Sequence, residues 1–219
     1  MGNILIAGVG GQGTVLASKL LAKAALLEGH MVRTAETIGM AQRGGTVLGH
    51  VRISRESTYG GARIGSYDDK PLSPLIGLGM ADLLIGFELS ETVRALPFVR
   101  QGGSIVTARQ VMEPPSAALS SKTHDGIAEL KYLLASRANR RLGSLSIVDG
   151  VAACSTLGSF KVLNVLLLGA ALATKGIDIT EESLDAALEA LVKPEYLELN
   201  KRALAAGMKF FATQEGKRT

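Results

Sequence analysis

Residues 4–13 read Ile4-Leu5-Ile6-Ala7-Gly8-Val9-Gly10-Gly11-Gln12-Gly13, a short apolar run that meets a glycine-rich loop. The branched apolar residues predict a buried strand, and apolar residues at helical spacing over 12–28 predict a helix directly after the loop. Gly29 supplies a helix stop, and residues 31–34 predict a second strand. Outward from the loop, the sequence therefore predicts a strand–helix–strand unit of an α/β fold.

The glycines at positions 8, 10 and 13 fit the G-x-G-x-x-G fingerprint of dinucleotide-binding proteins, and Glu36 lies where that pattern places a ribose-binding acid. Glycine permits a tight turn and lets another group approach the backbone. The helix that begins near Gln12 points N–H groups at the opening, which favours an anion. Glycines that only pack a helix against a strand would give the same pattern. The candidate cofactor-binding residues are Gly8, Gly10, Gly11, Gln12 and Gly13.

A second constrained loop, Gly39-Met40-Ala41-Gln42-Arg43-Gly44-Gly45, follows the second predicted strand. We expect it to leave the carboxyl edge of a parallel sheet, where ligands and partners usually meet this type of fold. The Arg43 guanidinium suits bidentate contact with a phosphate or a carboxylate, although it would also suit a turn with a solvated arginine. The predicted substrate- or partner-facing residues are Met40, Gln42, Arg43, Gly44 and Gly45.

Strand and helix patterns alternate up to about residue 150, and helical patterns alone follow. The further predicted strands are 46–53, 81–87, 104–107 and 145–148, with a short one near 63–65. The further predicted helices are 90–100, which Pro97 breaks, and 125–141, 151–157, 161–174, 181–192 and 195–213. This order predicts a three-layer α/β/α fold with a mostly parallel, Rossmann-like sheet. We expect a single domain over residues 1–219, with a sheet core in 1–150 and a C-terminal helical segment in 151–219.

Composition excludes several classes of protein. Cys154 is the only cysteine, so the chain alone cannot form an internal disulfide, a cysteine zinc site or an iron–sulfur cluster. The net charge is +4, but there is no Lys/Arg-rich tract or nucleic-acid motif, so we expect no nucleic-acid partner. The longest apolar run, 162–173, is too short to span a bilayer, and the N-terminus does not resemble a signal peptide. We expect a cytoplasmic protein with no membrane partner.

The sequence indicates no catalytic residue and no metal site. His30, His50 and His124 share no metal-ligand spacing, so structural roles are favoured for all three. Neither a nucleophile elbow nor a Ser/His/Asp set can be argued from spacing. Asn164 lies inside an apolar helix, where a buried amide needs a hydrogen-bond partner, and it is a further candidate site residue.

The order and spacing of the glycine loop, the 39–45 loop and His50-Val51-Arg52-Ile53 resemble the signature of a known family. It is that of the indolepyruvate:ferredoxin oxidoreductase beta subunit and of the wider gamma-type domain of 2-oxoacid:ferredoxin oxidoreductases. Residues 54–71 and 109–143 depart from the family pattern. The other similar stretches, which extend the resemblance over nearly the whole chain, are Ser73-Pro74-Leu75-Ile76, Ala81-Asp82-Leu83-Leu84, Arg94-Ala95-Leu96-Pro97, Asn164 and Glu198-Leu199-Asn200-Lys201.

The resemblance implies an accessory subunit in the oxidative decarboxylation of an aryl 2-oxoacid, with CoA, to an acyl-CoA, carbon dioxide and reduced ferredoxin. It implies that thiamine diphosphate and iron–sulfur clusters lie in a large alpha subunit, the main expected partner, and that this chain alone binds no cofactor. Ferredoxin is then an indirect partner, and the isolated chain is an inactive protein able to form a homodimer. The substrate stays open, because pyruvate, 2-oxoisovalerate and 2-oxoglutarate relatives share the scaffold.

Two other interpretations of the residues remain open. In the first, the chain is a free-standing NAD- or flavin-binding oxidoreductase, with the glycine loop on a pyrophosphate and Glu36 on a ribose. In the second, the chain is a non-catalytic scaffold. Binding of nicotinamide or flavin nucleotides to the purified chain would favour the first interpretation over the accessory subunit.

Overall fold

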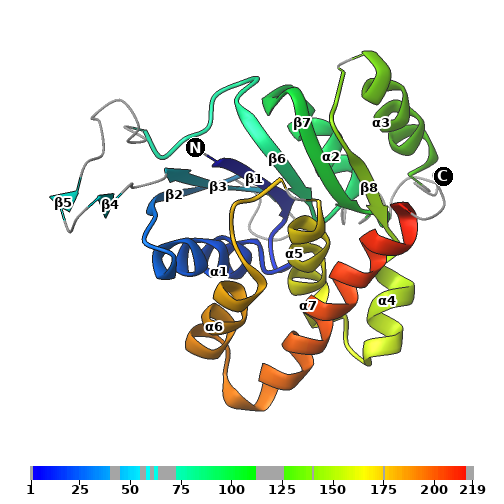
Figure 1. Ribbon diagram of the computed structural model, residues 1–219. Helices are drawn as coiled ribbons and strands as arrows, with labels where there is room; N and C mark the ends of the chain where they lie inside the picture. Colours follow the sequence, from blue (N-terminus) through cyan, green and yellow to red (C-terminus); the bar gives the residue numbers. More distant parts are fainter. Residues whose placement is uncertain are drawn as a thin grey trace.

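A six-stranded sheet forms the centre of the computed structural model, which describes residues 2–39, 45–54, 58–59, 62–63, 73–111, 126–139, 141–174 and 176–215 (Figure 1). In spatial order its strands are β2 (Met31–Ile38), β3 (Thr46–Ser54), β1 (Gly2–Val9), β6 (Ala81–Gly86), β7 (Val99–Ala108) and β8 (Leu145–Val148). Two short strands, β4 (Thr58–Tyr59) and β5 (Ala62–Arg63), pair with each other outside this sheet.

Helices cover both faces of the sheet, which confirms the predicted three-layer α/β/α fold (Figure 1). The first face packs on α1, α5, α6 and α7 through a core that includes Ile4, Leu20 and Leu167. The second face packs on α2 and α3 through a core that includes Leu5 and Leu133. The helices are α1 (Thr14–Leu27), α2 (Leu89–Ala95), α3 (Ile127–Asn139), α4 (Gly150–Leu157), α5 (Leu163–Ala173), α6 (Glu181–Leu191) and α7 (Pro194–Glu215), with 3-10 turns η2 (Leu96–Phe98) and η4 (Phe160–Val162).

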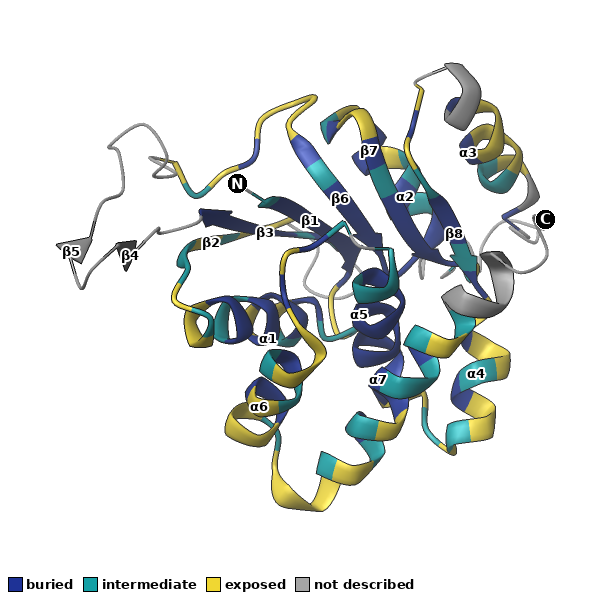
Figure 2. Cartoon of the chain, viewed as in Figure 1, coloured by how far each residue is buried: buried dark blue, intermediate teal, exposed yellow. Residues whose placement is uncertain are grey.

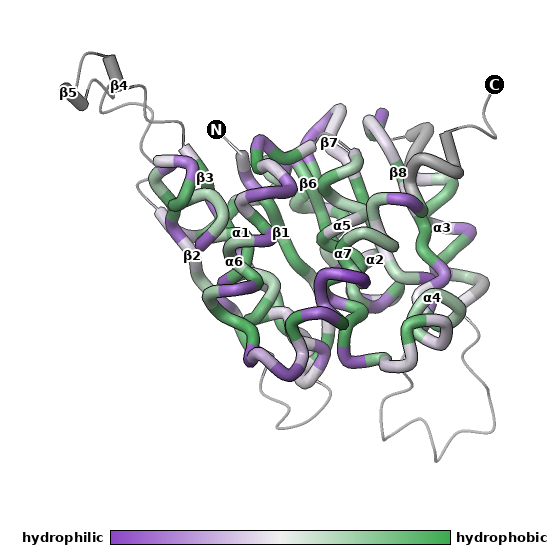
Figure 3. Tube along the Cα trace, turned by 60° about the horizontal axis from the view of Figure 1, so that its bottom comes forward, coloured by the Kyte–Doolittle hydropathy of each residue, from purple (hydrophilic) through white to green (hydrophobic). Residues whose placement is uncertain are grey.

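The apolar sequence of α5 is explained by its central place in the first helical layer. Residues 163–171 are all buried (Figure 2), and hydrophobic residues gather on α5 and the central strands (Figure 3). α7 approaches so closely that a Cβ at Gly169 would lie 2.1 Å from the Leu204 carbonyl oxygen. Among the described residues no single helix is long and apolar enough to cross a membrane. Taken together, α4 and residues 160–173 are long and apolar enough by length and composition alone, but a bend of 118° separates the two parts.

Parallel pairings join β1 to β6, β6 to β7 and β7 to β8, whereas β3 pairs antiparallel with both β1 and β2. The prediction of a mostly parallel sheet is therefore confirmed. The first strand–helix–strand unit differs from a dinucleotide-binding unit, however, because β3 lies between β1 and β2. Hydrophobic periodicity locates strands but does not determine which strands become neighbours.

Two predicted boundaries between residues 90 and 108 are wrong. The helix predicted over 90–100 ends at Ala95, followed by the η2 turn that contains Pro97, and Val99 already begins β7. Proline has no N–H to donate and ends a helix readily. The double glycine at 102–103 lies inside β7, where Gly102 has a φ of 74° and the pairing with β6 shifts register. The glycines thus form a bulge within β7, so the strand begins earlier than the predicted residue 104.

The amino ends of the parallel strands are connected by polar side chains, and we call this side of the sheet the amino edge. The buried Arg52 of β3 donates from Nε to Asn3 Oδ1 at 2.9 Å and from Nη1 to the Ser73 carbonyl at 2.8 Å. Asp82 of β6 accepts from the Asn3 N–H at 2.8 Å and pairs with Arg100 Nε at 2.5 Å. These contacts fix β1, β3, β6 and β7 relative to one another.

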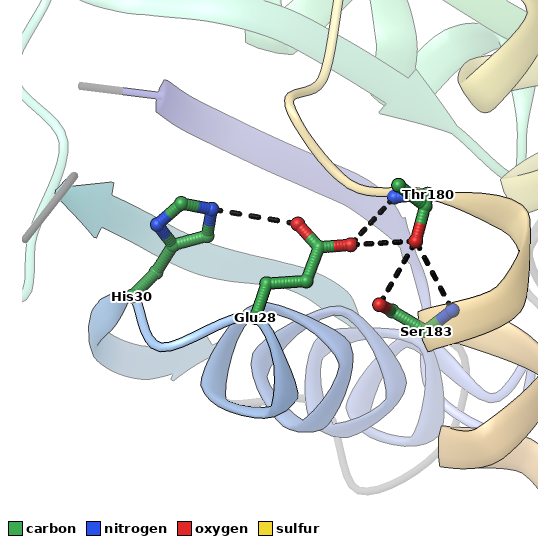
Figure 4. A network of polar contacts seen from close by, with 4 residues as sticks. All are labelled: Glu28, His30, Thr180 and Ser183. Carbon is green, nitrogen blue, oxygen red and sulfur yellow. Dashed lines mark hydrogen bonds and ion pairs between the residues drawn. The ribbon is translucent and has the colours of Figure 1, made fainter.

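A second polar network joins the end of α1 to the start of α6 (Figure 4). Glu28 Oε1 accepts from the Thr180 N–H at 2.7 Å and from its hydroxyl at 2.8 Å, and Glu28 Oε2 lies 3.4 Å from His30 Nε2. Thr180 Oγ1 accepts from the Ser183 N–H at 3.2 Å and so caps α6. Burial opposes ionisation of Glu28, but hydrogen bonds from Ser183 and Thr180 and the nearby His30 outweigh it and lower the pKa of this carboxyl.

Candidate functional site

The glycine loop lies at the carboxyl end of β1, beside the carboxyl end of β6. From β1 the chain crosses through α1 to the β2 side of the sheet, and from β6 it crosses through α2 to the β7 side. The two crossing helices lie on opposite faces. The connections therefore diverge at the loop, and in open α/β sheets ligands bind at such a switch point. We call this side of the sheet the carboxyl edge.

Gln12 fills the crevice between the two diverging connections. Its Oε1 accepts a hydrogen bond from the Val9 N–H at 2.9 Å, and its Nε2 donates to the Phe87 carbonyl at 3.4 Å. A Cβ at Gly8 would lie 2.7 Å from Gln12 Oε1 and 3.1 Å from Phe87 Cβ, so only glycine leaves room for this amide. Gln12 therefore positions the loop against the end of β6.

The loop presents backbone to its surroundings. Gly11 has a φ of 95° and Gly13 a φ of 82°, a backbone conformation that favours glycine. Gly13 is the N-cap of α1, and no side chain caps this helix. Gly10 and Gly11 are exposed. The uncapped first turn of a 14-residue helix beside exposed glycines suits the binding of an anionic group.

Asn164 holds the loop from the C-terminal segment. Its side chain is buried, with Nδ2 donating to the Gly13 carbonyl at 3.4 Å and Oδ1 accepting from the Val165 N–H at 2.9 Å. A Cβ at Gly13 would lie 2.6 Å from Asn164 Nδ2. The structure thus brings this candidate together with the glycine loop, from which it is 151 residues distant in sequence.

The second predicted loop reaches the same edge through its last residue. Gly45 is buried, and its carbonyl accepts a hydrogen bond from the Gly10 N–H at 3.0 Å. Met40, Gln42, Arg43 and Gly44 lie outside the described residues. The contact between Gly10 and Gly45 joins the glycine loop to the end of the second motif.

Glu36, the acid of the dinucleotide pattern, is not on the strand next to the glycine loop. It is exposed on β2, where it pairs with Gly49 of β3, and Gly49 in turn pairs with Ile6 of β1. Because neighbouring strands are about 4.8 Å apart, this arrangement separates Glu36 from β1 by roughly 10 Å. In the dinucleotide-binding fold the acid-bearing strand is the direct neighbour of β1, so the topology argues against ribose binding by Glu36.

His50 and Cys154 have structural surroundings. His50 is 3% exposed, its Nδ1 accepts from the Ile76 N–H at 3.1 Å, and burial lowers the pKa of its imidazole. His124 lies outside the described residues. Cys154 is buried, which raises the pKa of its thiol. Within the described ranges no group of three or more His, Cys, Asp or Glu side chains could hold a metal ion.

Further polar residues follow the other parallel strands at this edge. Glu88 is 1% exposed, and its side chain caps the start of α2. Gln110 follows β7, and its carbonyl accepts from the Leu89 N–H at 3.0 Å. Arg109 and Asp149 come directly after β7 and β8. Arg109, Gln110 and Asp149 are not among the predicted site residues, although their position after predicted strands was a usable signal.

Comparison with known proteins places these features in a family. A family described as "Pyruvate ferredoxin/flavodoxin oxidoreductase" matches residues 3–210. The indolepyruvate oxidoreductase subunit IorB of Thermococcus kodakarensis is 30% identical over 207 residues, which cover 94% of each chain.

Solved structures share the fold. The gamma subunit of a keto/oxoacid ferredoxin oxidoreductase from Geobacter sulfurreducens has a TM-score of 0.65 at 20% identity, covering 97% of this chain and 99% of that one. The 2-oxoglutarate:ferredoxin oxidoreductase of Magnetococcus marinus has a TM-score of 0.65 at 19% identity, covering 97% of this chain but 31% of that one. The same fold therefore occurs both as a separate subunit and as part of a longer chain.

Proposed function

Because the chain belongs to the pyruvate ferredoxin/flavodoxin oxidoreductase family, we propose that it is the accessory subunit of a 2-oxoacid:ferredoxin oxidoreductase. The complex decarboxylates a 2-oxoacid oxidatively, transfers the acyl group to CoA and passes the electrons to ferredoxin. The substrate is indolepyruvate or a related aryl 2-oxoacid, in line with the name of the Thermococcus kodakarensis relative. The observation that carries the proposal is the match to that relative over 94% of both chains.

The catalytic cofactors belong to a partner subunit in this proposal. Iron–sulfur clusters require several cysteine ligands, and this chain has Cys154 alone. Thiamine diphosphate is bound through a divalent metal, and the described residues contain no cluster that fits one. We infer a large alpha subunit that holds both cofactors and through which the electrons reach ferredoxin.

The contribution of this chain is a shaped backbone surface at the carboxyl edge. Gly8, Gly10, Gly11, Gln12 and Gly13 face the cofactor region of the partner, where the uncapped start of α1 favours a phosphate group of CoA or of the thiamine cofactor. Gln12 and Asn164 position this loop. The neighbouring Met40, Gln42, Arg43, Gly44 and Gly45 form the part that faces substrate or partner. No residue of this chain has a catalytic role.

We further infer that residues 1–219 act as one cytoplasmic domain. The core of the first face contains both Ile4 and Leu204, so the segment 151–219 and the sheet segment 1–150 share one set of buried residues. A single cysteine fits a reducing compartment. Without the partner, the exposed edge strand β2 allows two copies of the chain to pair as a homodimer.

Reconstitution of the complex tests the proposed function. The large partner subunit is prepared with and without this chain, and the reduction of ferredoxin is measured with indolepyruvate and CoA. We expect activity only in the complex, none in the isolated chain, and a preference for aryl 2-oxoacids over pyruvate, 2-oxoisovalerate and 2-oxoglutarate. A partner that forms no stable complex with this chain and is fully active alone would refute the accessory role.

Nucleotide binding separates this proposal from the free-standing oxidoreductase. The melting temperature of the purified chain is measured with NAD, NADP, FMN and FAD. We expect no stabilisation, because Glu36 lies on the far side of β3 from the glycine loop. Clear stabilisation by a submillimolar nucleotide would support the free-standing interpretation instead.

A further inference from the structure

A cavity of about 380 Å³ lies at the carboxyl ends of β7 and β8, on the same edge of the sheet as the glycine loop. Its described lining comes from the ends of β7 and β8, from β8 itself, and from α3 and α7. β6 lies between β7 and the loop-bearing β1, and the described lining includes no residue of the glycine loop. The lining residues are Arg109, Leu130, Leu134, Ile147, Asp149 and Phe210.

Apolar side chains form most of the wall of this cavity. Leu130 and Leu134 are one helical turn apart on the same side of α3. Ile147 contributes from β8 and Phe210 from α7, so the wall is built from both helical layers. Leu134 is 52% exposed, so apolar surface remains for a ligand to cover, and covering it is favourable.

Two opposite charges line the same cavity. Ala108 pairs with Val148, and the Arg109 N–H donates to the Val148 carbonyl at 2.9 Å, so Arg109 and Asp149 are neighbours across the strand ends. In the described part of the chain neither forms an ion pair within 4.0 Å. Asp149 Oδ1 accepts from the Ala152 N–H at 3.0 Å and caps α4. Both residues are exposed and line the same cavity, and their side chains do not form an ion pair with each other.

We propose that this cavity binds a free α-amino acid with a large apolar side chain. The Arg109 guanidinium donates to the carboxylate of the ligand, the Asp149 carboxylate accepts from its ammonium group, and its apolar side chain lies against Leu130, Leu134 and Phe210. An apolar carboxylate would contact Arg109 but not Asp149, and an apolar amine would contact Asp149 but not Arg109. Only a ligand with both charges beside an apolar group matches every part of the lining.

Isothermal titration calorimetry of the full chain tests the ligand class. The probes are L-tryptophan, L-phenylalanine and L-leucine, with 3-phenylpropionate lacking the amine, 2-phenylethylamine lacking the carboxylate, and free glycine lacking the apolar group. We expect saturable binding of at least one of the three amino acids and roughly tenfold or weaker binding of each truncated probe. Equal binding of 3-phenylpropionate and phenylalanine, or no binding of any of the three, would overturn the proposal.

Substitutions test the named contacts. Arg109→Met and Asp149→Asn each weaken binding roughly tenfold or more, and asparagine keeps an acceptor for the start of α4. Leu134→Gln, at a half-exposed position, weakens binding without loss of folding. Arg33→Gln removes an exposed arginine of β2 and leaves the affinity unchanged. If the Arg109 and Asp149 variants bind as the wild type does, the proposal is wrong.

These measurements need neither the partner subunit nor turnover. Failure of amino-acid binding therefore leaves the accessory role intact. Failure of reconstitution likewise leaves the cavity proposal intact, so the two results are distinguishable.

Discussion

The two edges of the sheet use their polar groups differently. At the amino edge, Arg52, Asn3, Asp82 and Arg100 satisfy one another across four strands. At the carboxyl edge, the glycine loop is held by Gln12, while exposed backbone and the uncapped start of α1 face outward. The first edge stabilises the fold, and the second leaves hydrogen-bonding groups for another molecule. Substitutions at the two edges should therefore have separable effects on stability and on activity.

The largest effect is expected from Gly13→Ala at the carboxyl edge. The new Cβ would lie 2.6 Å from Asn164 Nδ2 at a residue with a φ of 82°. We expect the activity of the reconstituted complex to fall about 100-fold, because a shift of about 1 Å in a positioning element has such an effect. Chemical denaturation should show a loss of about 1–3 kcal/mol in the free energy of unfolding.

Gly29→Ala is the matched control for this substitution. Gly29 has the same φ of 82°, and nothing lies within 4 Å of a Cβ built there. We expect it to lose about 1–2 kcal/mol of stability from backbone strain alone, with the activity of the complex retained. Equal activities of the two variants would contradict a positioning role for the glycine loop.

Arg52→Met tests the amino edge. The substitution leaves Asn3 Oδ1 and the Ser73 carbonyl without their buried donor, so we expect a loss of about 1–3 kcal/mol in the free energy of unfolding. The turnover of the folded complex should not change. Arg33→Met, the exposed residue paired with Arg52 in the β2–β3 register, should change stability by about 0.5 kcal/mol or less. A large loss of turnover in Arg52→Met would contradict the division between the edges.

Asn164→Ala is expected to have a smaller effect on stability than Arg52→Met. It removes the hydrogen bond to the Gly13 carbonyl and the one from the Val165 N–H, with an expected loss of about 1 kcal/mol. The clearer result should be faster hydrogen exchange at the amides of residues 10–14. Unchanged exchange there would show that Asn164 does not position the loop.

A pH-dependent effect, similar in size to that of Asn164→Ala but without a change in activity, is expected from Glu28→Gln. Because folding lowers the pKa of Glu28 below its ordinary value of 4.5, the carboxylate stabilises the folded chain above that pH, and this contribution is lost as the pH falls through the lowered pKa. At neutral pH the wild type should be more stable by about 1 kcal/mol in urea denaturation. The difference should shrink well below pH 4.5. A difference that stays constant into acid would contradict this account.

The elements that the sequence predicted well are those with strong local signals. Ile4, Leu5, Ile6 and Ala7 are all fully buried in β1, and the glycine loop does join β1 to α1. The predicted helices after residue 150 all occur, because their apolar positions repeat at helical spacing over long stretches.

The rest depends on contacts between distant residues, which a local pattern does not contain. The insertion of β3 between β1 and β2 removed Glu36 from the glycine loop, although the spacing of the acid was correct. Asn164 was a candidate because a buried amide needs a partner, but its partner, Gly13, lies at the other end of the chain. Arg109 and Asp149 follow neighbouring strand ends only because of the register of β7 and β8.

Hydrogen–deuterium exchange of this subunit, alone and in complex with the large partner, tests the difference between the edges most directly. We predict slower exchange in the complex at residues 8–16, 45–48 and 87–90 of the carboxyl edge, and unchanged exchange at residues 2–3, 52–54 and 99–102 of the amino edge. Protection confined to the amino edge, or no protection at the glycine loop, would contradict the assignment of the carboxyl edge as the partner-facing surface.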